Sequence, residues 1–375
     1  MQKNLFKFFF INYWRNIDKK ILFCFLILFF LGVFFSFSST SSLASERLNK
    51  DFYFFFTKHL LFTFLALTIM ILLSAIKTEF IVKFTLHFFI ISFILLALVP
   101  IIGVEVKGAK RWLDFYFFRL QPIEILKPLF ILAIAKILTS EKFKDTQIKY
   151  ILCFILLSSV LILLIDQPDL GQSILLTGSW VATVFISGIS LTYIFIFFSL
   201  FLIFLSLILF FLPEKLGYVI NRLIVFFDPN QGDKFQSSSA LDAIKQGGLT
   251  GQGMGEGILS ENVPEAHTDY VIAVISEEYG SIVSITILII FLFISFRIIK
   301  NCINQEDKFL KISLSGLATL LIFQTFIHGG VNTNLLPTTG MTLPFLSYGG
   351  SSLIGSAILA GLVLNYTKNK VYLYD

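Results

Sequence analysis

Residues 21–38 read ILFCFLILFFLGVFFSFS and contain no charged side chain. A helix needs about 20 apolar residues to cross the hydrocarbon core of a bilayer, so this stretch predicts a transmembrane helix. About ten segments qualify or nearly qualify by the same measure. They lie near residues 20–38, 54–76, 79–102, 121–140, 148–166, 170–187, 190–212, 270–298, 309–331 and 344–366. The sequence therefore predicts an all-α polytopic membrane protein with about ten transmembrane helices.

The overall composition agrees with this fold class. Of the 375 residues, 56% are hydrophobic, 14% are charged and 46 are Phe, and the mean hydropathy is +0.84. A soluble domain could not keep so much apolar sequence away from water. We therefore expect one helical bundle over residues 1–375. The net charge of +5 suits a protein facing anionic lipid, and because the basic residues are spread over short loops we expect no nucleic-acid partner.

The distribution of basic residues orients the predicted bundle, because cytoplasmic loops are enriched in Lys and Arg. Five of them precede the first span: Lys3, Lys7, Arg15, Lys19 and Lys20. This predicts a cytoplasmic N-terminus, and an even number of spans returns the C-terminus to the same side. Ser42-Leu43-Ala44 resembles a signal-peptide cleavage site. We favour an uncleaved first span, because the apolar run is long and Ala44 lies well past its end.

Two loops predicted to lie outside the membrane break the charge rule. Residues 103–120 carry four basic side chains, and residues 213–269 form one large extracytoplasmic loop with Gly and Asn-Gln clusters. Basic residues normally stay on the cytoplasmic side, so basic residues kept outside indicate an anionic ligand on that side. The alternative is that scattered basic residues tolerate export.

The first loop leads into a span that contains an ionic pair. GAKRW at 108–112 is followed by QPIE at 121–124 and by Lys127. Glu124 and Lys127 are three residues apart, so they share a helix face. Lys127 would lie about 5–10 Å into the membrane, and an intramembrane ion pair indicates a functional site. The alternative is a structural pair that locks two helices together.

Two further motifs border later spans. In QPDLG at 167–171 we favour Asp169 as the cap of the following helix. GGLTGQGMGEG at 247–257 has no Gly-Lys-Ser/Thr and is not a phosphate-binding loop; we expect its glycines to let a loop pack flat near the membrane surface. PEAHTDY at 264–270 clusters polar side chains just above the next span, with a spacing that matches no standard zinc site. Glu277 and Glu278 would lie about 12 Å deeper in that span, with at least one facing a polar interior.

The last motif is LPTTGMTLPFLSYGGSS at 336–352. So many Pro, Gly and Ser residues where a span begins predict irregular backbone that lines a cavity. The alternative is a tight connection with small-residue helix packing.

These stretches, in this order, resemble the SEDS family (shape, elongation, division and sporulation proteins). The matching motifs are GAKRW with QPIE-x-x-K, QPDLG, PEAHTDY, and LLPTTG with LPFLSYGGSS. GVEVKGAKRW, GQGMGEG and GMTLPFLSYGGSS look most like the division branch, with the elongation branch as the near alternative. The chain departs from the family pattern at Ile123, Thr339 and His328-Gly329.

The resemblance implies a peptidoglycan glycosyltransferase that polymerises lipid II, a lipid-linked disaccharide-pentapeptide, in the bacterial cytoplasmic membrane at the division septum. It also implies a class B penicillin-binding transpeptidase and other division proteins as partners. By the same resemblance Asp269 is the catalytic residue. The expected substrate-binding residues are Lys110, Arg111, Trp112, Gln121, Glu124, Lys127, Glu265, His267, Thr268, Ser347 and Tyr348.

The chemistry of such a transfer suits these residue types. A diphosphate leaves well once its charge is neutralised, so one base and a cationic clamp should suffice. We expect Asp269 to be the base and Arg111 and Lys127, with Lys110, to hold the diphosphate. A divalent cation, magnesium or manganese, is expected by the same charge argument, and no organic cofactor is expected. The alternatives are a lipid II flippase, which would want polar groups through the bilayer depth, and a non-catalytic scaffold.

Overall fold

The computed structural model describes residues 13–40, 53–106, 108–116, 118–211, 213–228, 235–259 and 263–368. The first half of the chain folds into the elements α2 (Lys19–Phe35), η1 (Ser36–Thr40), α4 (Phe54–Ala75), α5 (Thr78–Ile102), β1 (Val104–Val106), β2 (Ala109–Asp114), β3 (Arg119–Leu120), α6 (Pro122–Leu138), α7 (Thr146–Asp166) and α8 (Leu170–Ile186). The second half folds into α9 (Leu191–Phe211), α10 (Pro213–Phe227), α11 (Phe235–Gly247), α12 (Val271–Tyr279), α13 (Ser281–Ile303), α14 (Lys308–Asn332) and α15 (Gly350–Tyr366).

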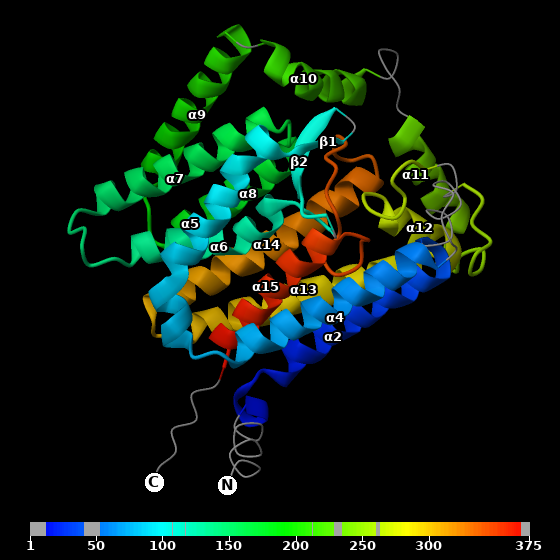
Figure 1. Ribbon diagram of the computed structural model, residues 1–375, viewed down its shortest axis with the longest axis horizontal. Coiled ribbons are helices and arrows are strands. Elements are labelled where there is room, and N and C mark those ends of the chain that lie inside the picture. Colours follow the sequence, from blue (N-terminus) through cyan, green and yellow to red (C-terminus); the bar gives the residue numbers. More distant parts are fainter. Residues whose placement is uncertain are drawn as a thin grey trace.

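Every segment predicted to span the membrane contains a helix of this bundle (Figure 1). Within the described residues, six helices are long and apolar enough to cross a membrane, and α8, α15 and part of α9 are shorter apolar helices. The prediction of a mostly helical, polytopic membrane protein is confirmed. In Figure 1, α9 leans away from the other helices and α10 lies across its far end.

The centre of the bundle is formed by α6, α14 and α15, whose side chains are buried on most sides, and α8 packs against them with one face. Small residues allow these helices to approach closely. A Cβ on Gly355 of α15 would collide with the backbone of Glu124 on α6, and one on Gly316 of α14 would collide with Ile131 of α6. The helices that carry several of the predicted site residues are therefore tightly packed against one another.

One end of the bundle collects the start of α2, the α4–α5 turn and the end of α15 (Figure 1). Asn365 near the end of α15 donates to the carbonyls of Leu73 and Ile76. Asp18, which caps α2, pairs with Arg297 of α13 at 3.0 Å. The start of α2 and the end of α15 therefore lie at the same end of the bundle.

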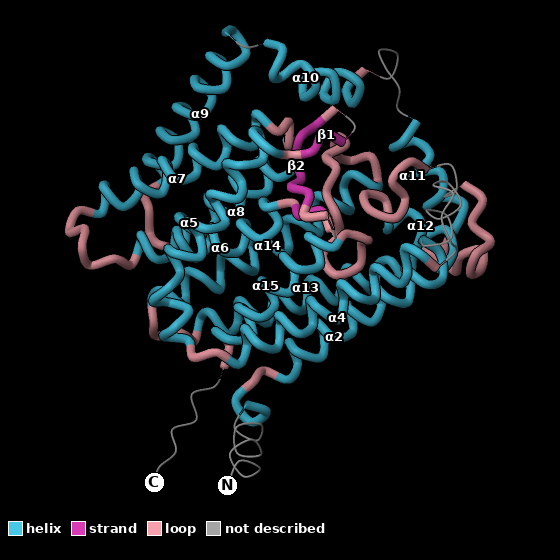
Figure 2. Tube along the Cα trace, viewed as in Figure 1, coloured by secondary structure: helices cyan, strands magenta, loops and turns pink. Residues whose placement is uncertain are grey.

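The opposite end carries the sheet, which the sequence did not predict (Figure 2). Residues of the 103–120 loop form three antiparallel strands in the order β1-β2-β3. Val104 pairs with Trp112, and Leu113 pairs with Leu120. This small sheet is an addition to the mostly helical fold, and β2 buries Arg111 and Leu113 because successive side chains of a strand point to opposite faces.

The predicted continuous span at 270–298 is wrong. The chain breaks at Gly280, which has φ 86°, and the hydroxyls of Ser276 and Ser284 lie 2.8 Å apart across the break. In one continuous helix these residues would be about 12 Å apart, so α12 and α13 must fold back on each other. Glu277 and Glu278 therefore belong to the short helix α12 and not to the long helix α13.

The connection between α14 and α15, residues 333–349, is a re-entrant loop that dips back into the bundle. Residues 333–349 form no helix, and Phe345 packs against Phe25 and Phe29 of α2 and Phe291 of α13. The helix predicted from residue 344 therefore begins only at Gly350. Irregular backbone at membrane depth is tolerated where it is buried in protein, so the prediction of irregular backbone here is confirmed.

Candidate functional site

The PEAHTDY motif forms a tight turn in front of α12. Glu265 has φ 57°, and its carbonyl oxygen accepts hydrogen bonds from the backbone N–H groups of Thr268 and Asp269, each at 3.0 Å. The Thr268 hydroxyl also donates to the Glu265 carboxylate at 3.1 Å. The turn therefore fixes the backbone of Asp269 through local hydrogen bonds, while α12 starts two residues later.

Asn332 at the end of α14 anchors the same turn from below. Its amide nitrogen donates to the carbonyl oxygen of Asp269 at 3.0 Å, and its amide oxygen accepts from the N–H of Ala273 at 3.1 Å. Asn332 is fully buried. The sequence reasoning missed this residue, although a polar side chain at the end of an apolar span is a signal that could have identified it.

The re-entrant loop holds the turn from its other side. The Ser347 hydroxyl donates to the carbonyl of Thr268 at 2.6 Å, and the Tyr348 N–H donates to the carbonyl of His267 at 2.9 Å. The Tyr348 ring lies 5.9 Å from the His267 ring, measured between centroids. Ser347 is buried, and its hydroxyl forms hydrogen bonds with the protein backbone.

Arg111 reaches the site from β2. Side chains alternate along this strand, so Arg111 and Leu113 are buried while Lys110 is exposed and Trp112 is half-buried. The guanidinium donates to the carbonyls of Gln167 and Pro168. Its Nε also lies 3.9 Å from Asp169 Oδ2. The QPDLG turn therefore orients Arg111.

Gly340 of the re-entrant loop lies where Asp269 and Arg111 converge. A Cβ built on Gly340 would be 3.6 Å from Asp269 Oδ2 and 3.7 Å from Arg111 Nη1. Gly340 has φ 71°, a left-handed conformation that favours glycine. A carboxylate and a guanidinium that are more than 150 residues apart in sequence thus face one small space.

Asp169 has the capping role that the sequence predicted. Its side chain accepts from the N–H of Gln172 at the start of α8. Burial raises the pKa of Asp169, and the nearby Arg111 acts in the opposite direction. Gln121, a predicted substrate-binding residue, donates its side-chain amide to Asp169 at 3.4 Å.

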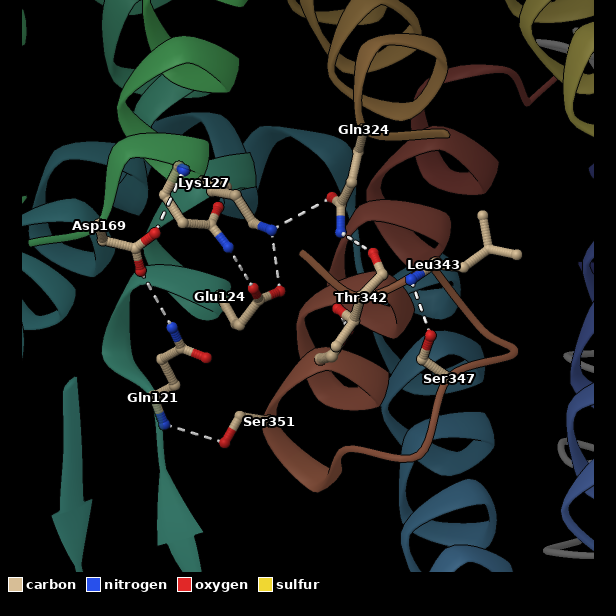
Figure 3. A network of polar contacts seen from close by, with 11 residues as sticks. Gln121, Glu124, Lys127, Asp169, Gln324, Thr342, Leu343, Ser347 and Ser351 are labelled. Carbon is tan, nitrogen blue, oxygen red and sulfur yellow. Dashed lines mark hydrogen bonds and ion pairs between the residues drawn. The ribbon is translucent and has the colours of Figure 1, made fainter. Parts of the chain in front are cut away.

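A buried polar network lies behind this site (Figure 3). Lys127 Nζ is 2.9 Å from Glu124 Oε2 and 3.1 Å from Gln324 Oε1. Gln324 in turn donates to the carbonyl of Thr342 in the re-entrant loop at 3.0 Å, and Gln172 donates to Glu124 at 2.8 Å. Lys127 and Glu124 are each 3% exposed. The ammonium of Lys127 is thus neutralised by a carboxylate and connected to the loop that holds Asp269.

The glycine-rich stretch at 247–257 packs against α12. The N–H groups of Gln252 and Gly253 donate to the carbonyls of Glu277 and Glu278 at 2.9 and 3.0 Å. Glu277 is fully buried, and its carboxylate accepts the N–H of Leu259 at 2.8 Å. The acidic pair therefore supports the loop that leads towards PEAHTDY.

Comparison with known proteins agrees with this geometry. The FtsW, RodA and SpoVE family of cell cycle proteins matches residues 18–372. The chain belongs to this family. A probable peptidoglycan glycosyltransferase FtsW of Caulobacter vibrioides is 32% identical over 357 residues, which cover 94% of this chain and 89% of the relative. Another, from Buchnera aphidicola, is 35% identical over 351 residues, which cover 90% of both chains.

Solved structures share the fold as well. A chain of a peptidoglycan synthase complex, described in terms of polymerization and crosslinking, superposes with a TM-score of 0.75 at 26% identity, covering 94% of this chain and 97% of that one. The rod shape determining protein RodA of Thermus thermophilus superposes with a TM-score of 0.68 at 25% identity, covering 94% and 96%. The multi-pass membrane fold is thus common to the family.

Proposed function

We propose that this chain is a peptidoglycan glycosyltransferase that polymerises lipid II, with Asp269 as the general base. The observation that supports this most is the convergence of Asp269 and Arg111 at Gly340, where the turn that carries Asp269 is held by α14 and by the re-entrant loop. The names of its FtsW relatives point to the same activity.

The proposed reaction transfers a sugar from a diphosphate to a hydroxyl group. The hydroxyl oxygen of the acceptor sugar attacks the anomeric carbon of the donor, whose bond to the diphosphate oxygen breaks. Asp269 accepts the hydroxyl proton, and the polyprenyl diphosphate leaves as an anion. Arg111, held by backbone carbonyls and near a carboxylate, is placed to offset the negative charge that gathers there.

We propose that a divalent cation binds together with the substrate diphosphate and not at a separate protein site. Within the described ranges, no group of three or more His, Cys, Asp or Glu side chains could hold a metal ion. Magnesium or manganese would therefore take most of its ligands from diphosphate oxygens, which hard cations prefer.

We further propose that the protein acts in the cytoplasmic membrane at the septum, with a class B penicillin-binding transpeptidase as partner. The FtsW names of the relatives favour division, and the peptidoglycan synthase complex favours a partner. The RodA likeness supports an elongation role as second candidate. Depletion of the protein should give filaments of normal width; rounded cells that still divide would favour elongation.

The decisive experiment uses Asp269→Asn, which keeps the shape of the side chain and removes its basicity. Loss of a general base typically lowers the rate about 10²–10⁴-fold. Purified variant and wild type would be compared for polymerisation of labelled lipid II, with and without the transpeptidase. Thermal unfolding serves as the control for folding. A variant that polymerises at a near-normal rate would show that the base lies elsewhere, with Glu265 as the next candidate.

A further inference from the structure

The middle of the re-entrant loop, on either side of Gly340, forms neither helix nor strand. Its carbonyl groups therefore depend on side chains for their hydrogen bonds. Two of them accept from Arg222 of α10 and from Gln324 of α14. A third, the carbonyl of Met341, lies 2.8 Å from Nδ1 of His328, which is also a residue of α14. The carbonyl that His328 contacts thus belongs to the residue directly after Gly340.

The two ring nitrogens of His328 have different surroundings. The residue is buried inside the bundle. A carbonyl oxygen can only accept, so Nδ1 carries the hydrogen of the neutral ring and donates to Met341. Nε2 is then an acceptor, and it has no hydrogen-bond partner in the described part of the chain. The contribution of the imidazole to the polar contacts of the loop therefore comes from Nδ1–H alone.

The same face of α14 also holds the turn that carries Asp269. His328 and Asn332 are four residues apart, about 6 Å along the helix axis, so their side chains share one face. Asn332 donates to the carbonyl of Asp269 at 3.0 Å and to that of His328 at 2.8 Å. One turn of α14 thus contacts both the backbone of Asp269 and the loop that contains Gly340.

Met341 is held from a second side by α8. Its side chain is buried, and a Cβ built on Gly171 would lie 2.8 Å from Met341 Cγ, so the side chain packs closely on the first turn of α8. With its side chain on α8 and its carbonyl on His328, Met341 is fixed between two helices of the bundle. The backbone of Gly340, the preceding residue, is fixed with it.

We propose that His328 is a positioning residue for the glycosyl transfer: its Nδ1–H fixes the Met341 carbonyl and so holds Gly340 beside the carboxylate of Asp269. This inference rests on the proposed function. His328 acts through the loop backbone and is not a catalytic residue. Without the hydrogen bond the loop can shift relative to Asp269, so the rate of transfer should fall more than the affinity for substrate. His328 is also a position at which the chain departs from the family pattern, and the hydrogen bond gives that departure a role.

Two amide substitutions distinguish the two ring nitrogens. The side-chain amide of Asn can place its N–H groups where Nδ1 lies, whereas that of Gln is one bond further from the backbone, near Nε2. His328→Asn should therefore keep the bond to Met341 and a normal kcat for lipid II polymerisation. His328→Gln and His328→Leu should lower kcat about 3- to 10-fold, the effect of one lost neutral hydrogen bond, with little change in KM. Thr325→Val is the control, because the buried Thr325 hydroxyl donates within α14, to the carbonyl of Leu321.

Hydrogen–deuterium exchange of the re-entrant loop measures its position without any turnover. In purified full-length protein in detergent, the loop amides around Gly340 should exchange faster in the Gln and Leu variants of His328 and at the wild-type rate in the Asn variant. Wild-type exchange and kcat in His328→Gln would overturn the proposal. Equal losses in His328→Asn and His328→Gln would also overturn it, because the imidazole shape would then matter and not its Nδ1–H. A fall in kcat of the same size in Thr325→Val would indicate a general effect of α14 stability and would likewise overturn it.

The two readouts separate this inference from the proposed function. If no form of the protein polymerised lipid II while loop exchange still differed between His328→Asn and His328→Gln, the activity would be wrong and the control of the loop by His328 would stand. If the wild type polymerised lipid II while exchange was the same in every variant, only the inference about His328 would fail. The Asn and Gln variants carry the same amide group, so a folding defect caused by polarity alone would lower the unfolding temperature of both.

Discussion

Replacing Lys127 with methionine separates two roles for this residue. The sequence predicted that Lys127 holds the substrate diphosphate, whereas the structure shows its ammonium 2.9 Å from the Glu124 carboxylate, with both side chains almost fully buried. Breaking a buried ion pair by removing one partner destabilises a protein by about 3–5 kcal/mol. Lys127→Met should therefore lower the free energy of unfolding by roughly this amount.

The double-mutant cycle gives the sharper measurement. Glu124→Gln should be about as destabilising as Lys127→Met, because it leaves the lysine charge buried. The combination of both should recover most of the loss, since no uncompensated charge remains. Thermal unfolding of the full-length protein in detergent reports stability, and lipid II polymerisation by the folded fraction reports activity.

One result would refute this reasoning. If Lys127→Met were as stable as wild type while its KM for lipid II rose by more than about 10-fold, Lys127 would contact substrate as the sequence predicted. If stability fell and the folded fraction kept a normal KM, the residue would serve to hold the re-entrant loop through Gln324.

Further predictions concern the turn and the far end of the bundle. Gly340→Ala places a methyl group 3.6 Å from Asp269 Oδ2, so kcat should fall, and the left-handed backbone should cost about 1–2 kcal/mol of stability. Gly188→Ala is the control: this position is also left-handed but has nothing within 4 Å, so only stability should fall. Asn332→Leu removes the anchor of Asp269 and should lower kcat together with the unfolding temperature, and unchanged kcat in folded protein would contradict that role. Burial disfavours the charge of Asp18, but hydrogen bonds from two α13 side chains lower its pKa. Its stabilisation is thus present above the unfolded pKa of about 3.9 and is lost as pH falls through the lower folded pKa. Asp18→Asn should lower the free energy of unfolding at pH 7 and make that free energy depend less on pH below about pH 4. The same pH dependence in the variant and the wild type would argue against this contribution.

Several features of the site could be predicted from the sequence because they depend on local order. Asp169 directly precedes a helix and caps it, and Glu124 and Lys127 pair because three residues along a helix bring side chains together. The motif order also indicated the family, which the match over residues 18–372 confirms.

The sequence alone determined that this chain is a membrane bundle, because apolar runs of about 20 residues have no other stable environment. Tertiary structure decided what the polar residues do. Gly280 bends the chain sharply, so Glu277 lies in the short helix α12 and not in the predicted continuous span. Asp269 and Arg111 both lie next to Gly340, and no spacing rule predicts such a meeting across so many residues. The physical reason is that helix and strand periods act over a few residues, whereas a buried charge is satisfied by whichever partner the packed fold brings to it.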